Sequence, residues 1–135
     1  SQAVSDLRKS VSLLKRSCRA SVRIVQANSY DQLLRHPPHC KHRKLIFLDP
    51  PYDSVNSYFT WNFYMLKRLH ERWPAATIAL WFPCYDAQQT QQFLKRVRQL
   101  QLGEVLSAEM ILQRKSRQLW GSGLLVVCPP PNLEE

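Results

Sequence analysis

The residues with the clearest chemical potential are Asp49, Pro50, Pro51 and Tyr52, which directly follow the apolar run at 45–48. Such a run is typical of a buried parallel strand, and open α/β sheets bind ligands at the carboxyl ends of their strands. A carboxylate, two prolines and an aromatic ring at that place would form a rigid, flat and polar slot. The pattern therefore predicts a site for a planar base that carries an amino group.

The chemistry of an aromatic amine explains why these residue types are needed. The lone pair of an exocyclic nitrogen such as adenine N6 is delocalised into the ring, so the amine is a weak nucleophile. Asp49 and the Pro50 carbonyl can each accept one amino hydrogen, which frees the lone pair for an incoming methyl group. Proline holds that carbonyl still because its φ is fixed, and Tyr52 can stack on the base for about 1–3 kcal/mol. The alternative is an ordinary turn, in which Asp and Pro are common; the preceding strand and the following aromatic ring favour the site.

Composition and charge bound the class of protein. The chain has 135 residues, of which 44% are hydrophobic, and this suits one packed domain. Its net charge of +9 favours a polyanionic partner, and residues 1–44 alone carry a balance of +8. Basic flanks around a near-neutral centre suit a catalytic slot with phosphate-contacting surfaces beside it. For residues 1–20, a solvated basic arm is an equal alternative.

Other features of the composition exclude several classes. No apolar stretch approaches the length of a membrane span, and no secretory signal pattern opens the chain. The four cysteines (Cys18, Cys40, Cys84, Cys128) form no Cys-x-x-Cys pair, which favours reduced thiols in an intracellular compartment. Because the first residue is Ser1, we expect the chain to be processed or to be a piece of a longer protein.

The hydrophobic periodicity predicts alternating helices and strands. Helices are expected over 4–17, 30–35 and 58–69, and after the N-cap Asp86 as far as Gly103; strands are expected over 22–27, 44–48, 77–82, 105–112 and 124–128. Pro83 is expected to end the third strand. The polar segment 113–122 suits an antiparallel hairpin between the last two strands. This order predicts an α/β fold with a mostly parallel sheet that ends in an antiparallel hairpin.

Three sequence blocks occur in order along the chain. They are Leu-Ile-Phe-Leu-Asp-Pro-Pro-Tyr-Asp at 45–53, Ala-Leu-Trp-Phe-Pro at 79–83, and Gly-Ser-Gly-Leu-Leu-Val-Val-Cys-Pro-Pro at 121–130. Together they resemble the bacterial RlmJ family, which methylates an adenine N6 in large-subunit ribosomal RNA with S-adenosylmethionine. The resemblance covers roughly residues 20–131. It implies a Rossmann-like S-adenosylmethionine-dependent methyltransferase fold, with transfer that needs no metal.

The resemblance also implies roles for individual residues. Asp49, Pro50 and Tyr52 would hold and activate the target adenine, while Asn28, Ser29 and Asp49 would contact the cofactor. The family has Asp-Gly where this chain has Asn28-Ser29. Asn can still form a hydrogen bond, but Ser29 places a side chain where the family has the small glycine next to the cofactor.

One departure from the family is larger. All three glycines (Gly103, Gly121, Gly123) lie in the last third of the chain, so the Gly-rich turn that follows the first strand of the family's fold is absent. The resemblance therefore predicts an incomplete fold that lacks its first two strands. Residues 1–20 would be a basic amphipathic helix, 21–131 the C-terminal part of a methyltransferase domain, and 132–135 a tail. A longer protein, a second chain that completes the sheet, or a decayed scaffold would each explain this.

Several other clusters have weaker interpretations. His36, His39, Cys40 and His42 are too tightly spaced for a structural zinc site, so no metal site is predicted. Arg114, Lys115 and Arg117, with Trp120 nearby, predict an RNA contact at the hairpin tip; a solvated tip is the alternative. Trp61, Trp73 and Trp81 are expected in the core, and Cys84 is expected to be a packing residue.

These observations lead to one main hypothesis, an enzyme that methylates adenine N6 in ribosomal RNA. The second hypothesis is a non-catalytic, RNA-binding scaffold in a ribosome or a ribosome-assembly particle. A DNA methyltransferase is a weaker third. Expected partners are ribosomal RNA, with a ribosomal particle or a second chain as further candidates and no membrane. The expected compartment is the cytoplasm, or the mitochondrion for a ribosome-assembly factor.

Overall fold

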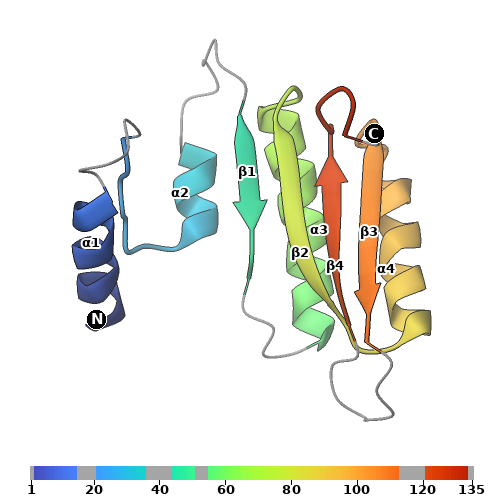
Figure 1. Ribbon diagram of the computed structural model, residues 1–135. Coiled ribbons are helices and arrows are strands. Elements are labelled where there is room, and N and C mark those ends of the chain that lie inside the picture. Colours follow the sequence, from blue (N-terminus) through green and yellow to red (C-terminus); the bar gives the residue numbers. More distant parts are fainter. Residues whose placement is uncertain (1, 15–20, 36–43, 51–54, 113–120, 134–135) are drawn as a thin grey trace. The chain divides into compact units, whose positions relative to one another are not determined.

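The computed structural model describes residues 2–14, 21–35, 44–50, 55–112 and 121–133. The chain divides into two compact units, residues 1–35 and 36–135. The first unit contains α1 (Gln2–Leu14) and α2 (Ser29–Arg35), and the second contains β1 (Leu45–Leu48), α3 (Val55–Arg72), β2 (Thr77–Cys84), α4 (Ala87–Gln99), β3 (Val105–Ile111) and β4 (Gly121–Val127) (Figure 1). The predicted mixture of helices and strands is confirmed, with the exceptions given below.

The second unit is built on a four-stranded sheet in the order β1-β2-β4-β3. β1 runs parallel to β2, with Leu45 opposite Thr77 and Leu48 opposite Leu80. β4 is antiparallel to both β2 and β3. The expected antiparallel hairpin is therefore present between β3 and β4. Because β1 and β2 are parallel, their carboxyl ends lie at the same edge of the sheet.

Helices α3 and α4 both lie on one face of this sheet (Figure 1). Alternate residues of β2 face them: Ile78, Leu80 and Phe82 are at most 1% exposed. The Phe93 ring on α4 packs between the two layers, 5.1 Å from the Phe82 ring and 5.5 Å from the Phe63 ring on α3. Each fully buried side chain of this size stabilises the fold by about 1.5–3 kcal/mol. The core of this unit therefore lies between the sheet and its two helices.

The opposite face of the sheet is also apolar. Leu45 and Phe47 on β1 are 71% and 60% exposed, and Met110 on β3 is 62% exposed. In the described part of the second unit, no helix covers this face (Figure 1). β1 pairs with β2 along one edge and has no other strand partner among the described residues.

The first unit corrects one prediction. Residues 22–27 were expected to form a strand, but residues 21–27 are in neither a helix nor a strand, and Val22 and Val25 are 43% and 50% exposed. The β-branched residues there have the right propensity, but a strand also needs a hydrogen-bonded neighbour. No described strand provides one, so the prediction of a strand is wrong for this structure.

Two predictions for the second unit are also corrected. β2 continues through Pro83 to Cys84, because beyond Leu80 it is bordered by β4 alone, and proline is tolerated where one side of a strand is open. Trp61 was expected in the core but is 58% exposed. Trp73 is buried as expected, and Trp81 is half-buried. Among the described residues, no helix has the length and apolarity needed to cross a membrane.

Gly123 provides a test of the packing between β2 and β4. Gly123 lies opposite Phe82, and a Cβ atom at this position would collide with the Phe82 ring. We expect Gly123→Ala to lower the free energy of unfolding by about 1–3 kcal/mol, as overpacking does in other cores. Urea unfolding measures this change. The control is Ser122→Ala, on the neighbouring half-buried position, which should change stability by less; equal effects of the two substitutions would contradict this account of the packing.

Candidate active site

The candidate site begins at the carboxyl end of β1. Asp49 follows the last residue of this strand and is exposed, and Pro50 is half-buried. Extending the parallel register by one residue places Asp49 beside Trp81 of β2. The carboxylate was predicted to lie outside the core at the end of a strand, and the structure places Asp49 there. Tyr52, the third predicted catalytic residue, lies outside the described residues.

The end of β2 and the start of α4 form the neighbouring part of this edge. Cys84 is fully buried, and Tyr85 is 38% exposed. Asp86 caps α4, because its carboxylate accepts a hydrogen bond from the Gln89 N–H at 2.9 Å. Asp86 is therefore committed to the helix, whereas Asp49 is an exposed carboxylate at the end of β1.

The thiol of Cys84 has no chemical role in this arrangement. Burial raises the pKa of the Cys84 thiol, the Thr90 hydrogen bond partly opposes the rise, and the Glu109 carboxylate adds to it. A thiol with a raised pKa stays neutral near physiological pH and is a poor nucleophile. These facts agree with the predicted packing role.

Asn62 is a residue that the sequence analysis did not single out. It lies on the core side of α3 and is 1% exposed, and neither its Oδ1 nor its Nδ2 atom has a hydrogen-bond partner in the part of the chain that the structure describes. The Lys44 ammonium lies 4.8 Å from the Trp73 ring, which ties the end of α3 to the start of β1. Counted from this contact, Asn62 lies 11 residues away along a helix that rises about 1.5 Å per residue, and Asp49 lies five residues away along a strand that rises about 3.3 Å per residue. The two spans are similar in length, so Asn62 and Asp49 lie at similar heights along the sheet. The sequence did contain a signal for Asn62, because it is a polar residue on the same helix face as the apolar positions 65, 66 and 69.

Asn28 and Ser29, the predicted cofactor residues, belong to the first unit. The Asn28 Oδ1 atom accepts hydrogen bonds from the Tyr30 N–H at 3.0 Å and the Asp31 N–H at 3.3 Å. Asn28 is therefore the N-cap of α2. Since the oxygen serves the helix, any contact with a ligand would use the Nδ2 group. Both Asn28 and Ser29 are exposed.

The remaining predicted sites lie outside the described residues. They are Arg114, Lys115 and Arg117, proposed for RNA, and the cluster at 36–42 that was judged a poor zinc site. Within the described ranges, no group of three or more His, Cys, Asp and Glu side chains could hold a metal ion. Cys84 and Cys128, the two described cysteines, are free thiols.

The described sheet thus has an exposed Asp49, followed by the half-buried Pro50, at the end of a parallel strand. A family model described as "Ribosomal RNA large subunit methyltransferase D, RlmJ" matches residues 4–135. The chain belongs to this family.

Two curated relatives agree with this assignment. The chain is 29% identical over 112 residues to "Ribosomal RNA large subunit methyltransferase J" of Haemophilus influenzae, covering 79% of this chain and 38% of the relative. It is 27% identical over 115 residues to the Escherichia coli protein of the same name, covering 84% of this chain and 41% of that one. The chain therefore spans about two fifths of the length of these relatives.

A solved structure shows the same fold. A Legionella pneumophila protein, described under the family name DUF519, superposes with a TM-score of 0.69 at 23% sequence identity. The match covers 79% of this chain and 40% of that protein. At this identity the similarity concerns the fold alone.

Asn62→Leu should stabilise the protein. Leucine has a similar size, and it removes two buried polar atoms that make no hydrogen bond, each of which costs about 1–3 kcal/mol. We expect the free energy of unfolding, measured in urea, to rise by at least about 1 kcal/mol. Met65→Leu, on the same face of α3, is the control and should not raise it. A lower stability of Asn62→Leu would mean that the carboxamide has partners in solution.

The raised pKa of Cys84 predicts how stability depends on pH. An unfolded cysteine ionises near pH 8.5, so the contribution of buried Cys84 is fully present below that pH. It is lost as the pH rises toward the higher folded-state pKa, because the unfolded chain releases its proton first. We expect the free energy of unfolding to fall between about pH 8 and pH 10, and to fall less steeply in Cys84→Val. An identical slope in both proteins would contradict this cause.

Proposed function

We propose that this chain is part of an enzyme that transfers a methyl group from S-adenosylmethionine to the N6 atom of an adenine in large-subunit ribosomal RNA. The observation that carries the proposal is the exposed Asp49, followed by the half-buried Pro50, at the carboxyl end of β1, in a chain that belongs to the RlmJ family. The names of the relatives state the RNA class but not the atom. The two acceptors favour an exocyclic amine, and the choice of adenine N6 follows from the resemblance to the RlmJ family.

Two hydrogen-bond acceptors of the chain would activate the amine by changing the geometry of its nitrogen. Asp49 and the Pro50 carbonyl each accept one N6 hydrogen, and the nitrogen then becomes tetrahedral with its lone pair directed away from both. Pro50 suits this role because its φ is fixed and its nitrogen carries no hydrogen that would compete. The exposure of Asp49 supports entry of the base from solvent. A base within a duplex could not reach Asp49, so the target adenine must be flipped out or single-stranded.

When bound, S-adenosylmethionine would supply the methyl group in this proposal: the methyl–sulfur bond would break as the bond to N6 forms, and N6 would then lose one proton to solvent. Its amines and ring nitrogens need both acceptors and donors. The exposed Asp49 carboxylate supplies an acceptor, and the Nδ2 group of Asn28, whose oxygen already caps α2, supplies a donor. Each of these two side chains, taken by itself in its own unit, could make one such contact. The Gly-rich turn of the family's fold is not in this sequence, in which the glycines are Gly103, Gly121 and Gly123.

We also infer that the working enzyme has a larger, Rossmann-like sheet. Leu45 and Phe47 on the edge strand β1 are 71% and 60% exposed, and β1 has one strand partner among the described residues. An apolar strand with an open edge favours addition of another strand. The relatives are more than twice as long as the segment that matches this chain, so either further sequence or a second chain would complete the sheet.

The second candidate function is a non-catalytic RNA-binding scaffold. The helix-capping role of the Asn28 oxygen favours it, because that oxygen is already used within the protein. The exposed Asp49 next to Pro50 argues for the enzyme, because a scaffold does not need a carboxylate and a fixed carbonyl at a strand end.

Asp49→Asn and Asp49→Ala should each lower methyl transfer to ribosomal RNA by about 10²-fold or more. Alanine removes the acceptor that orients the amine, and asparagine replaces the carboxylate with a weaker, neutral acceptor whose N–H₂ group can face the amine instead. Since Asp49 is exposed, both variants should keep their stability within about 0.5 kcal/mol of the parent. Incorporation of labelled methyl from S-adenosylmethionine by the longest available form of the protein measures the rate. The control is Glu104→Gln, an exposed carboxylate at the far end of the sheet, which should retain full activity.

Bound RNA without label transfer, together with no measurable affinity for S-adenosylmethionine, would exclude the enzyme and leave the scaffold. Full activity of Asp49→Ala would show that the site lies elsewhere in the protein.

A further inference from the structure

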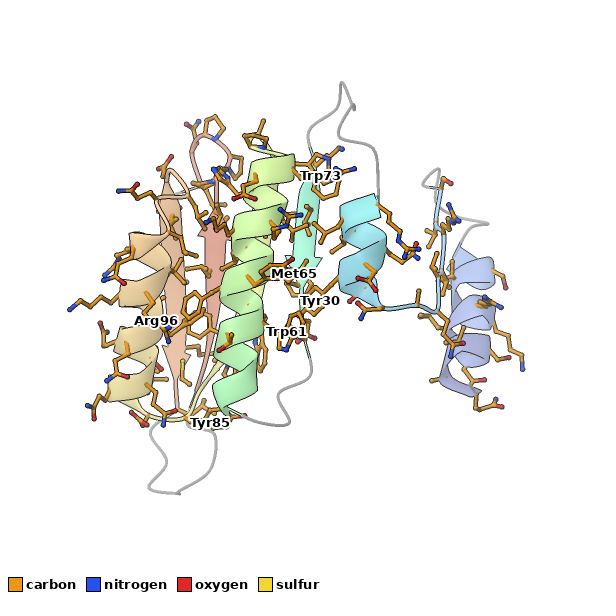
Figure 2. The ribbon with its side chains drawn as sticks, turned by 180° about the vertical axis from the view of Figure 1, so that it is seen from behind. Tyr30, Trp61, Met65, Trp73, Tyr85 and Arg96 are labelled. Atoms are coloured by element: carbon orange, nitrogen blue, oxygen red, sulfur yellow. The ribbon has the colours of Figure 1, made fainter. Side chains whose placement is uncertain are left out.

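Helix α3 carries a pair of aromatic rings on its surface. Trp61 and Tyr64 are 58% and 50% exposed, and their ring centroids lie 6.1 Å apart at an interplanar angle of 87°. Figure 2 shows Trp61 on the helix, in the view in which the helices lie in front of the sheet. Adjacent exposed large aromatic side chains mark interaction sites more often than single ones do.

The core of the second unit does not require these two rings. α3 contacts the sheet through Met65, Leu66 and Leu69, which are at most 1% exposed. Phe63, on the side toward α4, contacts Phe93. At 3.6 residues per turn, positions 61 and 64 lie away from the centre of this buried stripe. The two rings therefore contact each other at the surface and leave much of their area to solvent.

Exposed cations occupy the next turn of the same helix. Lys67 and Arg68 are exposed, and the Arg68 guanidinium lies 3.5 Å from the Glu71 carboxylate with both side chains about half exposed. An exposed ion pair of this kind contributes little, about 0–1 kcal/mol. Arg68 can therefore exchange Glu71 for a phosphate at little cost.

The neighbouring helix extends the positive charge. α4 adds Lys95, Arg96 and Arg98, all exposed, and the Arg96 guanidinium lies 4.9 Å from the Phe63 ring centroid, at the junction of the two helices. Within residues 60–99, all of which the structure describes, the acidic residues are Glu71 and the capping residue Asp86. The outer face of the helix layer is therefore strongly basic.

We propose that Trp61, Tyr64, Lys67 and Arg68, which we call the α3 stripe, bind a single-stranded segment of RNA next to the target adenine. Exposed aromatic rings stack on unpaired bases, and adjacent cations bind the phosphates. The proposal rests on the proposed function, since it concerns the same RNA. A second copy of this chain fits the stripe poorly, because pairing would bring the basic faces of two helix layers together.

The position of the α3 stripe agrees with this role. Trp61 precedes Asn62, which lies at about the height of Asp49 along the sheet. From Trp61 to Arg68 the helix rises about 10 Å, which is the scale of a few nucleotides. A strand that delivers its adenine to Asp49 could therefore continue along α3 toward the basic residues.

The test is a titration of a labelled, single-stranded ribosomal RNA fragment with the longest available form of the protein. Binding is measured as the fluorescence anisotropy of the label on the RNA. We expect Trp61→Ala and Tyr64→Ala each to weaken binding by about tenfold. Trp61→Phe and Tyr64→Phe, which keep a ring, should recover most of the affinity. Arg68→Gln should weaken binding and reduce the slope of log Kd against log salt by about one.

The matched control is Arg98→Gln, which makes the same change of charge on the side of α4 that faces away from α3. The proposal requires that Arg98→Gln weakens binding less than Arg68→Gln. Unchanged affinity in both alanine variants, with the parent protein still bound to RNA and still active, would overturn the α3 stripe and leave the proposed function intact. No binding of RNA by the parent would overturn both. Self-association that is lost in Trp61→Ala, without loss of RNA affinity, would assign the stripe to a protein interface and also overturn the proposal.

Discussion

The packing of one face of β2 against α3 and α4 is the interaction on which the rest of the second unit depends. Ile78, Leu80, Phe82 and Cys84 alternate along this strand and are almost completely buried. Because β2 is held against the helices, β1 can pair along one side in parallel and β4 along the other in the antiparallel direction. The position of every other strand follows from this pairing.

The function depends on what this packing leaves outside the core. The parallel pair places the end of β1 at the same edge as the end of β2, and Asp49 is the first residue beyond β1. An exposed carboxylate on a rigid strand end can be positioned accurately and still meet a substrate. Asn62 differs from Asp49 because it is buried. It lies at a similar height along the sheet, and neither of its polar atoms makes a hydrogen bond to a described residue. The stability of this region is thus not at its maximum, a condition often found near functional sites.

The sequence predicted those features that local pattern determines and missed those that depend on neighbours. The apolar run before Asp49 and the capping carboxylate of Asp86 were sufficient to place β1 and α4. The strand expected at 22–27 and the end expected at Pro83 were wrong, because a strand and its tolerance of proline depend on which strands lie beside it. Trp61 was expected in the core because its type and helical spacing do not tell which side of α3 is covered. Tyr52 and the hairpin-tip cations stay predictions.

The central claim concerns the atom that accepts the methyl group, and nucleoside analysis tests it most directly. Ribosomal RNA methylated by the longest available protein would be digested to nucleosides, and the labelled product would be identified by chromatography and mass spectrometry. Two hydrogen-bond acceptors, Asp49 and the Pro50 carbonyl, can activate an exocyclic amine, so the account predicts that the label is in N6-methyladenosine. Label on a ring nitrogen, on the ribose, or on a base other than adenine would contradict it.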